Sequence, residues 1–115
     1  MSNVASSFCH RCVLFLFLVY WLASNAAHAQ QDKIDSLNSL LNSTGRDSLR
    51  ASVLLQLSRE MYRSGRYDDE ARYATEALKL SQMVAYTNGE GDGLSILGHM
   101  AMRKGNYDSA IQYFD

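Results

Sequence analysis

Few residues of this 115-residue chain could do covalent chemistry. After residue 29 there is one histidine, His99, and no cysteine, since Cys9 and Cys12 both come earlier. A structural zinc site takes about four Cys or His ligands, so none can be built there. A serine nucleophile would depend on His99, and the G-x-S-x-G turn that presents such a serine is missing. We therefore predict no catalytic residue, no metal site, no cofactor and no enzyme activity.

Two acidic stretches could in principle hold a cation or act as paired acids. The pattern N-x-E-x-D-G at residues 88–93 resembles the first half of a calcium-binding EF-hand loop. The twelfth position of such a loop supplies a bidentate carboxylate, and here it falls on His99. We therefore interpret residues 87–93 as a flexible connector. The acidic run at residues 68–70 is expected in the first turn of a helix, where the helix dipole favours carboxylates.

Residues 1–29 follow the order of a secretory signal peptide. A polar lead containing Arg11 precedes an apolar run at residues 13–23, and small or polar residues follow as far as Ala29. The apolar run is shorter than the roughly 20 residues that a membrane-spanning helix needs. We predict cleavage after Ala29 and export to the periplasm or the extracytoplasmic face of a membrane. Membrane contact is then expected only through this segment or through one further along the chain.

Cleavage would also remove both cysteines, so their C-x-x-C spacing predicts no redox role and no disulfide. The net charge of the chain is −1 at neutral pH. A nucleic-acid-binding surface is typically strongly basic, so no nucleic-acid partner is expected.

The remaining chain has no proline, and its apolar residues recur at helical spacing. A leader segment at residues 30–45 places Ile34, Leu37 and Leu41 on one helix face. The next helix is expected from Asp47 or Ser48, as N-cap, to Arg63. Further helices are expected at residues 68–86 and 94–104, and a last one from Asp108.

Two glycines, Gly65 and Gly105, follow predicted helices and are expected to take the left-handed conformation that lets a chain reverse. Short turns of this kind make neighbouring helices antiparallel. The two glycines are also part of a sequence repeat, and its period of about 40 residues is typical of a repeat array. The first copy covers residues 46–86, and the second, at 87–115, stops in mid-pattern.

These positions resemble the tetratricopeptide repeat, a helix–turn–helix unit with fixed large, small, glycine and tyrosine positions. The residues that match in the first copy are Leu54, Leu57, Ser58, Gly65, Tyr67 and Ala77. In the second copy they are Leu94, Leu97, Gly98, Gly105, Tyr107, Ala110 and Phe114. The resemblance covers residues 32–115 and implies an all-α fold, an α-solenoid of antiparallel helix pairs.

The first copy departs from the family pattern in its second helix. Glu70 stands where the family has a small residue, and Ala74 stands where it has an aromatic one. We expect a slight rotation of this helix that brings Ala71 into the small position. The alternative leaves Glu70 there.

The long period resembles repeats of exported bacterial sensor proteins, in which an array leads to a histidine kinase or a DNA-binding module. That resemblance implies the ligand-sensing front part of a longer signal-transduction protein. The alternative is a periplasmic repeat protein that assembles other proteins and has no signalling output.

In this family the first helix of each pair lines a groove that binds a protein or peptide. The corresponding residues here are Gln56, Arg59, Tyr62, Arg63, Ile96, His99, Met102 and Arg103. Arginines beside a tyrosine would suit a peptide with acidic and apolar side chains. The alternative is an ordinary solvated face, with Arg59 or Arg63 paired to acids such as Glu60. Self-association is a further mode open to such an array.

Overall fold

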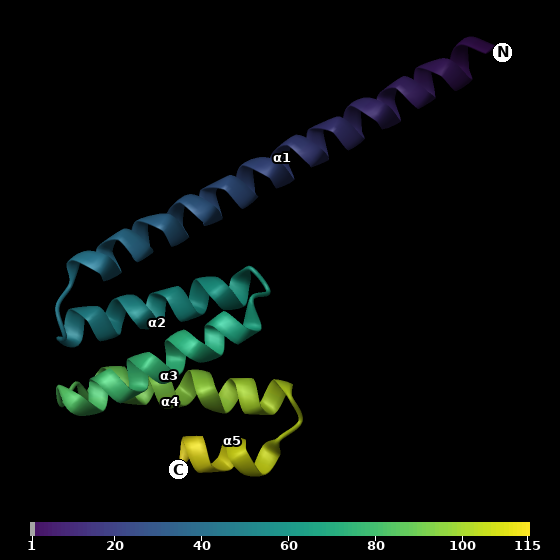
Figure 1. Ribbon diagram of the computed structural model, residues 1–115. Coiled ribbons are helices and arrows are strands. Elements are labelled where there is room, and N and C mark those ends of the chain that lie inside the picture. Colours follow the sequence, from purple (N-terminus) through teal and green to yellow (C-terminus); the bar gives the residue numbers. More distant parts are fainter. Residues whose placement is uncertain (1) are drawn as a thin grey trace. The chain divides into compact units, whose positions relative to one another are not determined.

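The computed structural model describes the backbone of residues 2–115 and the side chains of residues 5–115. These residues form helices and turns, without a strand, so the predicted all-α class is confirmed (Figure 1). The helices are α1 (Ser2–Ser43), α2 (Ser48–Arg63), α3 (Tyr67–Met83), α4 (Thr87–Arg103) and α5 (Tyr107–Phe114). They belong to two compact units, Met1–Lys33 and Ile34–Asp115.

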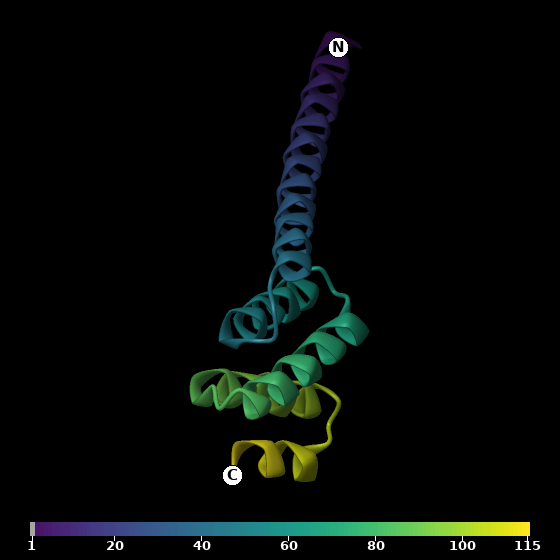
Figure 2. The same ribbon diagram turned by 60° about the vertical axis from the view of Figure 1, so that its left-hand side comes forward.

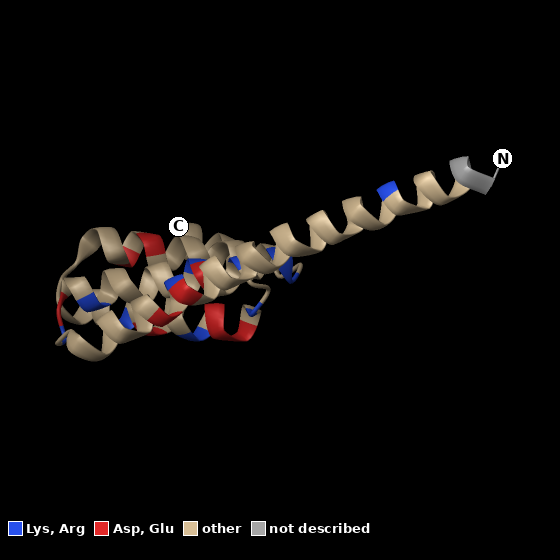
Figure 3. Cartoon of the chain, turned by 90° about the horizontal axis from the view of Figure 1, so that it is seen from above, with Lys and Arg blue, Asp and Glu red and all other residues tan. Residues whose placement is uncertain are grey.

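The N-terminal unit is a helix with exposed apolar side chains. Arg11 is the only Lys, Arg, Asp or Glu in its residues 5–31, so this helix is almost uniformly uncharged in Figure 3. Between Ala5 and Ser43 the helix is long and apolar enough to cross a membrane. The apolar character is therefore compatible with a signal peptide and also with a membrane span.

The last turns of α1 belong to the second unit and carry the apolar face that the sequence predicts. Ile34 and Leu37 are buried and pack in one cluster with Val53, Leu57 and Met61 of α2. The expected leader helix does not begin afresh near residue 30, because α1 continues through it without a break. It is the C-terminal part of one long helix.

Hydrogen bonds fix the passage from α1 to α2. Asp47 is the N-cap of α2, as predicted, and its carboxylate accepts a hydrogen bond from the backbone N–H of Arg50 at 3.0 Å. The Arg50 guanidinium donates to the carbonyl oxygen of Leu41 at 2.7 Å. The end of α1 is thus tied to the first turn of α2, which satisfies one of the carbonyls that every helix end leaves open.

From α2 to α5 each helix packs beside the next, and α4 also reaches α2 (Figures 1 and 2). The connections are three turns of one kind. Their residues with positive φ are Gly65 (73°), Ala85 (54°) and Gly105 (73°), evenly spaced along the chain. Backbone N–H groups of Arg66, Tyr86 and Asn106 each donate to the carbonyl five positions earlier, at 2.8–2.9 Å. This bond is the signature of the Schellman motif. The predicted conformation of Gly65 and Gly105 is confirmed.

The turn at Ala85 overturns the expected connector at residues 87–93. These residues form the first turns of α4, which begins at Thr87 instead of near residue 94. Glycine is normally unfavourable inside a helix, but here it permits close packing. A Cβ on Gly89 would lie 2.3 Å from Cδ1 of Tyr86, and one on Gly93 would lie 3.1 Å from Cβ of Leu78.

The starts of α3 and α5 also differ from the prediction. Both begin at a tyrosine, one position before Asp68 and Asp108. The side chain of Asn106 caps α5 by accepting a hydrogen bond from the N–H of Ser109 at 3.2 Å. In α3 no side chain caps the helix, and Asp69 in its acidic first turn accepts hydrogen bonds from the side chains of Arg66 and Arg72. Hydrogen bonds from the neighbouring Arg72 and Arg66 side chains lower the pKa of that carboxyl.

The proposed rotation of α3 is wrong. Glu70 is buried, with 3% of its surface exposed, and Ala71 is only half-buried. Glu70 can take the small position because Ser58, on the facing helix, is small and donates its hydroxyl to the Glu70 carbonyl oxygen at 3.0 Å. A carboxylate therefore enters the interior of the helix pair and needs a cation there.

The repeat-defining residues differ in burial between the two copies. Leu54, Leu57, Ser58 and Ala77 are fully buried in the first. In the second, Gly98 and Ala110 are buried and Leu94 and Leu97 are half-buried. The aromatic positions are about half exposed or more: Tyr67 at 52%, Tyr107 at 66% and Phe114 at 49%.

Candidate functional site

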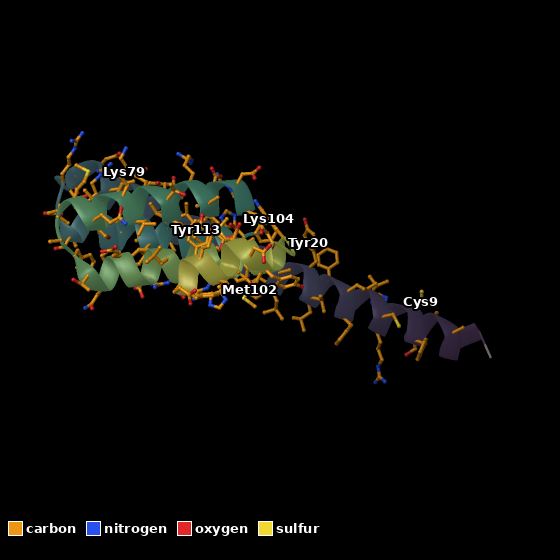
Figure 4. The ribbon with its side chains drawn as sticks, turned by 90° about the horizontal axis from the view of Figure 1, so that it is seen from below. Cys9, Tyr20, Lys79, Met102, Lys104 and Tyr113 are labelled. Carbon is orange, nitrogen blue, oxygen red and sulfur yellow. The ribbon has the colours of Figure 1, made fainter. Side chains whose placement is uncertain are left out.

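A cavity of about 360 Å³ opens between α2, the start of α3 and α4. Its lining residues are Arg59, Tyr62, Glu70, Ile96, His99, Met102 and Arg103, and we call it the α2/α4 groove. Its volume falls at the lower end of the range of about 300–1,000 Å³ typical of ligand pockets. Met102, labelled in Figure 4, is 46% exposed, and Tyr62 is 47% exposed.

Six of the eight residues that sequence predicts for a groove line this cavity. Gln56 and Arg63 are not among the lining residues. Glu70 is, although the sequence analysis treated it as a departure from a repeat pattern. A carboxylate at a position that must be small and buried was the signal that could have indicated its role, because buried acids almost always have a partner.

Arg103 is the most constrained side chain of the groove. Its guanidinium forms an ion pair with the Glu70 carboxylate, whose side chain is only 4% exposed. The guanidinium carbon also lies 4.6 Å from the ring centre of Tyr62 and 5.3 Å from that of Tyr67. A planar guanidinium suits both contacts, a carboxylate at its edge and aromatic rings against its face. Arg103 is therefore held by groups from α2 and α3 together.

The other two arginines predicted to face a ligand are also paired within the chain. Arg59 on α2 contacts Asp92 on α4 at 3.1 Å, and Arg63 contacts Glu60 at 2.7 Å. The Arg59–Asp92 pair is about half exposed and contributes little stability. Arg63 is thus paired with the local acid Glu60, as in the alternative that the sequence left open, whereas Arg59 is paired with a residue of another helix, Asp92 on α4.

The far wall of the groove is supported by α5. The ring of His99 meets the ring of Phe114 edge to face, with centres 5.4 Å apart. Phe114 can approach because the residue beneath it is Gly98, where a Cβ would lie 2.6 Å from the end of the Phe114 ring. In the second copy, the small Gly98 thus lets Phe114 come close enough to support the ring of His99. The equivalent small residue of the first copy, Ser58, instead donates a hydrogen bond to the backbone of α3.

A second cavity, of about 530 Å³, lies in the second unit beside the α1–α2 connection. Its lining includes the cations Arg46, Arg50 and Lys79, together with Glu76. Arg50 is 3.7 Å from Glu76 and also bonds to the backbone. Arg46 and Lys79 have no carboxylate partner within the described side chains. Uncompensated positive charge therefore lies here and not in the α2/α4 groove.

No protein-family model, no curated protein and no solved structure matches this chain. Among the described residues there is also no cluster of three or more His, Cys, Asp and Glu side chains suited to a metal. The groove offers ring faces, aliphatic side chains and paired charges. This arrangement can bind a ligand.

Proposed function

We propose that residues 46–115 form a tetratricopeptide-type α-solenoid that binds a segment of a partner protein in the α2/α4 groove. One observation carries this proposal. Arg59 and Tyr62 on α2 correspond, one repeat later, to His99 and Met102 on α4, and all four line one cavity. Equivalent positions of two successive units thus converge on one surface, as in a repeat array that binds along its inner face.

The turns support the same assignment. Left-handed residues at the equally spaced positions 65, 85 and 105 divide α2 to α5 into successive helices that pair with their sequence neighbours. One repeating unit is then two helices with two equivalent turns. We take such an array to act by binding, because its exposed inner face offers side chains for contact with a partner.

We further infer that the chain is exported, with residues 1–29 as a signal peptide cleaved after Ala29. The exposed apolar helix near the N-terminus supports export. Mass spectrometry of the cell-associated and secreted protein tests it. A new N-terminus at Gln30 is expected, and an intact N-terminus on membrane-associated protein would show that the helix is retained as an anchor.

The biological role that fits this proposal is the ligand-sensing front part of a longer signalling protein with a kinase or DNA-binding output. The alternative is a periplasmic assembly protein without such an output. The downstream reading frame separates them. About 20 apolar residues followed by Lys or Arg favour the sensor, and a stop codon after one or two further repeats favours the assembly protein.

The binding proposal is tested by photo-crosslinking in the cells that produce the protein. A photoreactive residue at Met102 should capture a partner, and the same residue at Thr75, exposed and outside every cavity described above, should not. The substitution Ile96→Glu should abolish the Met102 crosslink. Equal capture from both positions, or a crosslink that Ile96→Glu leaves intact, would refute binding in this groove.

A further inference from the structure

We propose that the α2/α4 groove accepts an uncharged, apolar side chain of its partner and discriminates against an acidic one. The inference rests on the proposed function, because it names the ligand chemistry of the same groove. The sequence alone suggests a peptide with both acidic and apolar side chains, and the present inference keeps only the apolar ones.

Glu70 determines this preference because it already binds Arg103, one of the two arginines that line the groove. An acidic ligand would have to displace Glu70 or lie beside it. Displacement would leave a carboxylate that is 4% exposed without its cation, and an uncompensated buried charge is strongly unfavourable. A ligand carboxylate beside Glu70 would place two like charges together, which is also unfavourable. Both routes weaken the binding of an acid.

The second arginine of the groove, Arg59, also has its charge balanced by a carboxylate. Arg59 lines the groove, and the Asp92 carboxylate lies 3.1 Å from its guanidinium. This pair is half exposed and easier to separate than the Glu70–Arg103 pair, so its influence on an acidic ligand is smaller. Each arginine that lines the groove is accompanied by one carboxylate, so no net positive charge attracts an acid.

Apolar surface remains between these two ion pairs. Tyr62 and Met102 are each nearly half exposed there, and Ile96 lies with them along the groove. Methionine is unbranched and adapts to irregular apolar shapes, and burying exposed apolar surface favours binding. The groove therefore suits one short segment with a Leu, Ile, Met or aromatic anchor, and its modest volume does not suit a large rigid surface.

The test uses two capped amino acids, N-acetyl-leucinamide and the α-amide of N-acetyl-glutamate, with the full chain in phospholipid nanodiscs. Binding is followed by the ¹³C-methyl signals of Ile96 and Met102. The leucine probe is expected to bind about ten-fold more tightly than the acidic probe, the size of a lost charge-assisted hydrogen bond.

Glu70→Gln should reduce that ratio to about one, because Arg103 is then free to accept the acidic probe. Glu76→Gln is the matched control, since it makes the same change on α3 at a residue 48% exposed and outside the groove. It should leave the ratio unchanged. Asp92→Asn, an exposed substitution that does not threaten folding, should reduce the ratio by about two- to three-fold, in keeping with the weakness of an exposed ion pair.

Wild-type protein that binds the acidic probe as tightly as the leucine probe would overturn the inference and leave the groove as a binding site. An unchanged ratio in both Glu70→Gln and Asp92→Asn would overturn it as well. If neither probe shifts the Ile96 or Met102 methyl signals, the proposed function fails together with the inference.

Discussion

The turn between α3 and α4 should be stabilised by the single substitution Ala85→Gly. Ala85 has φ 54°, in the left-handed region, whereas the equivalent residues of the other two turns are Gly65 and Gly105. An L-residue in this region costs about 1–2 kcal/mol. Glycine removes that strain but costs roughly 0.5–1 kcal/mol more in unfolded-state entropy. The net gain should be about 0.5–1 kcal/mol.

Hydrogen exchange of the α3 and α4 amides in the full chain measures this effect, because exchange of core amides reports the free energy of opening. We expect exchange in Ala85→Gly to slow by about two- to five-fold, since about 1.4 kcal/mol corresponds to a factor of ten. Gly65→Ala and Gly105→Ala are the reciprocal controls. A Cβ at either glycine meets nothing within 4 Å, so only the backbone conformation is tested. Both should speed up exchange. Exchange in Ala85→Gly that is equal to or faster than wild type would refute the assigned turn.

Other substitutions test the close helix packing and the acidic turn of α3. In urea unfolding, Gly89→Ala should destabilise the protein by about 1–3 kcal/mol through overpacking. Gly91→Ala in the same helix should instead stabilise it by up to about 1 kcal/mol, because a Cβ there meets nothing within 4 Å. The reverse order would show that α4 does not approach α3 in this way. Gly98→Ala should destabilise the protein by a similar amount, about 1–3 kcal/mol. In a double-mutant cycle this loss should be smaller when Phe114 is also replaced by alanine. Strictly additive losses of stability from the two substitutions would refute the contact. The pKa of Asp69, measured by NMR, should lie below the ordinary 3.8. The contribution of Asp69 to stability is then present above about pH 4 and is lost as the pH falls through the lowered pKa. An unshifted pKa would contradict its two arginine contacts.

The fold could be predicted where one local signal decides the structure. The spacing of Leu54, Leu57 and Met61 gives the buried face of α2, and Gly65 and Gly105 mark two of the turns. The third turn could not be predicted, because Ala85 gives no sign of a left-handed backbone. The glycines after it indicate a loop, yet they lie in a helix, where Gly89 and Gly93 pack against α3. Tertiary contacts outweigh propensity there.

Most residues that line the groove could be predicted from the sequence, but the pairing of their charges could not. A helical face on each of two repeats predicts which side chains meet, and six of those residues share one cavity. The partner of Arg103 could not be predicted, because Glu70 lies far away in the sequence and on a different helix. Ion pairs between helices depend on a register that the repeat pattern alone left open at this position.

The most direct test of binding in the α2/α4 groove is the oxidation of two methionines, in cells and in the purified full chain. Met102 lines the groove and is 46% exposed, while Met83 lies outside it and is 63% exposed. Oxidation follows exposure, so a partner in the groove should slow oxidation of Met102 relative to Met83 in cells, and purification should remove that protection. The same ratio of the two rates in both samples would contradict binding at this surface.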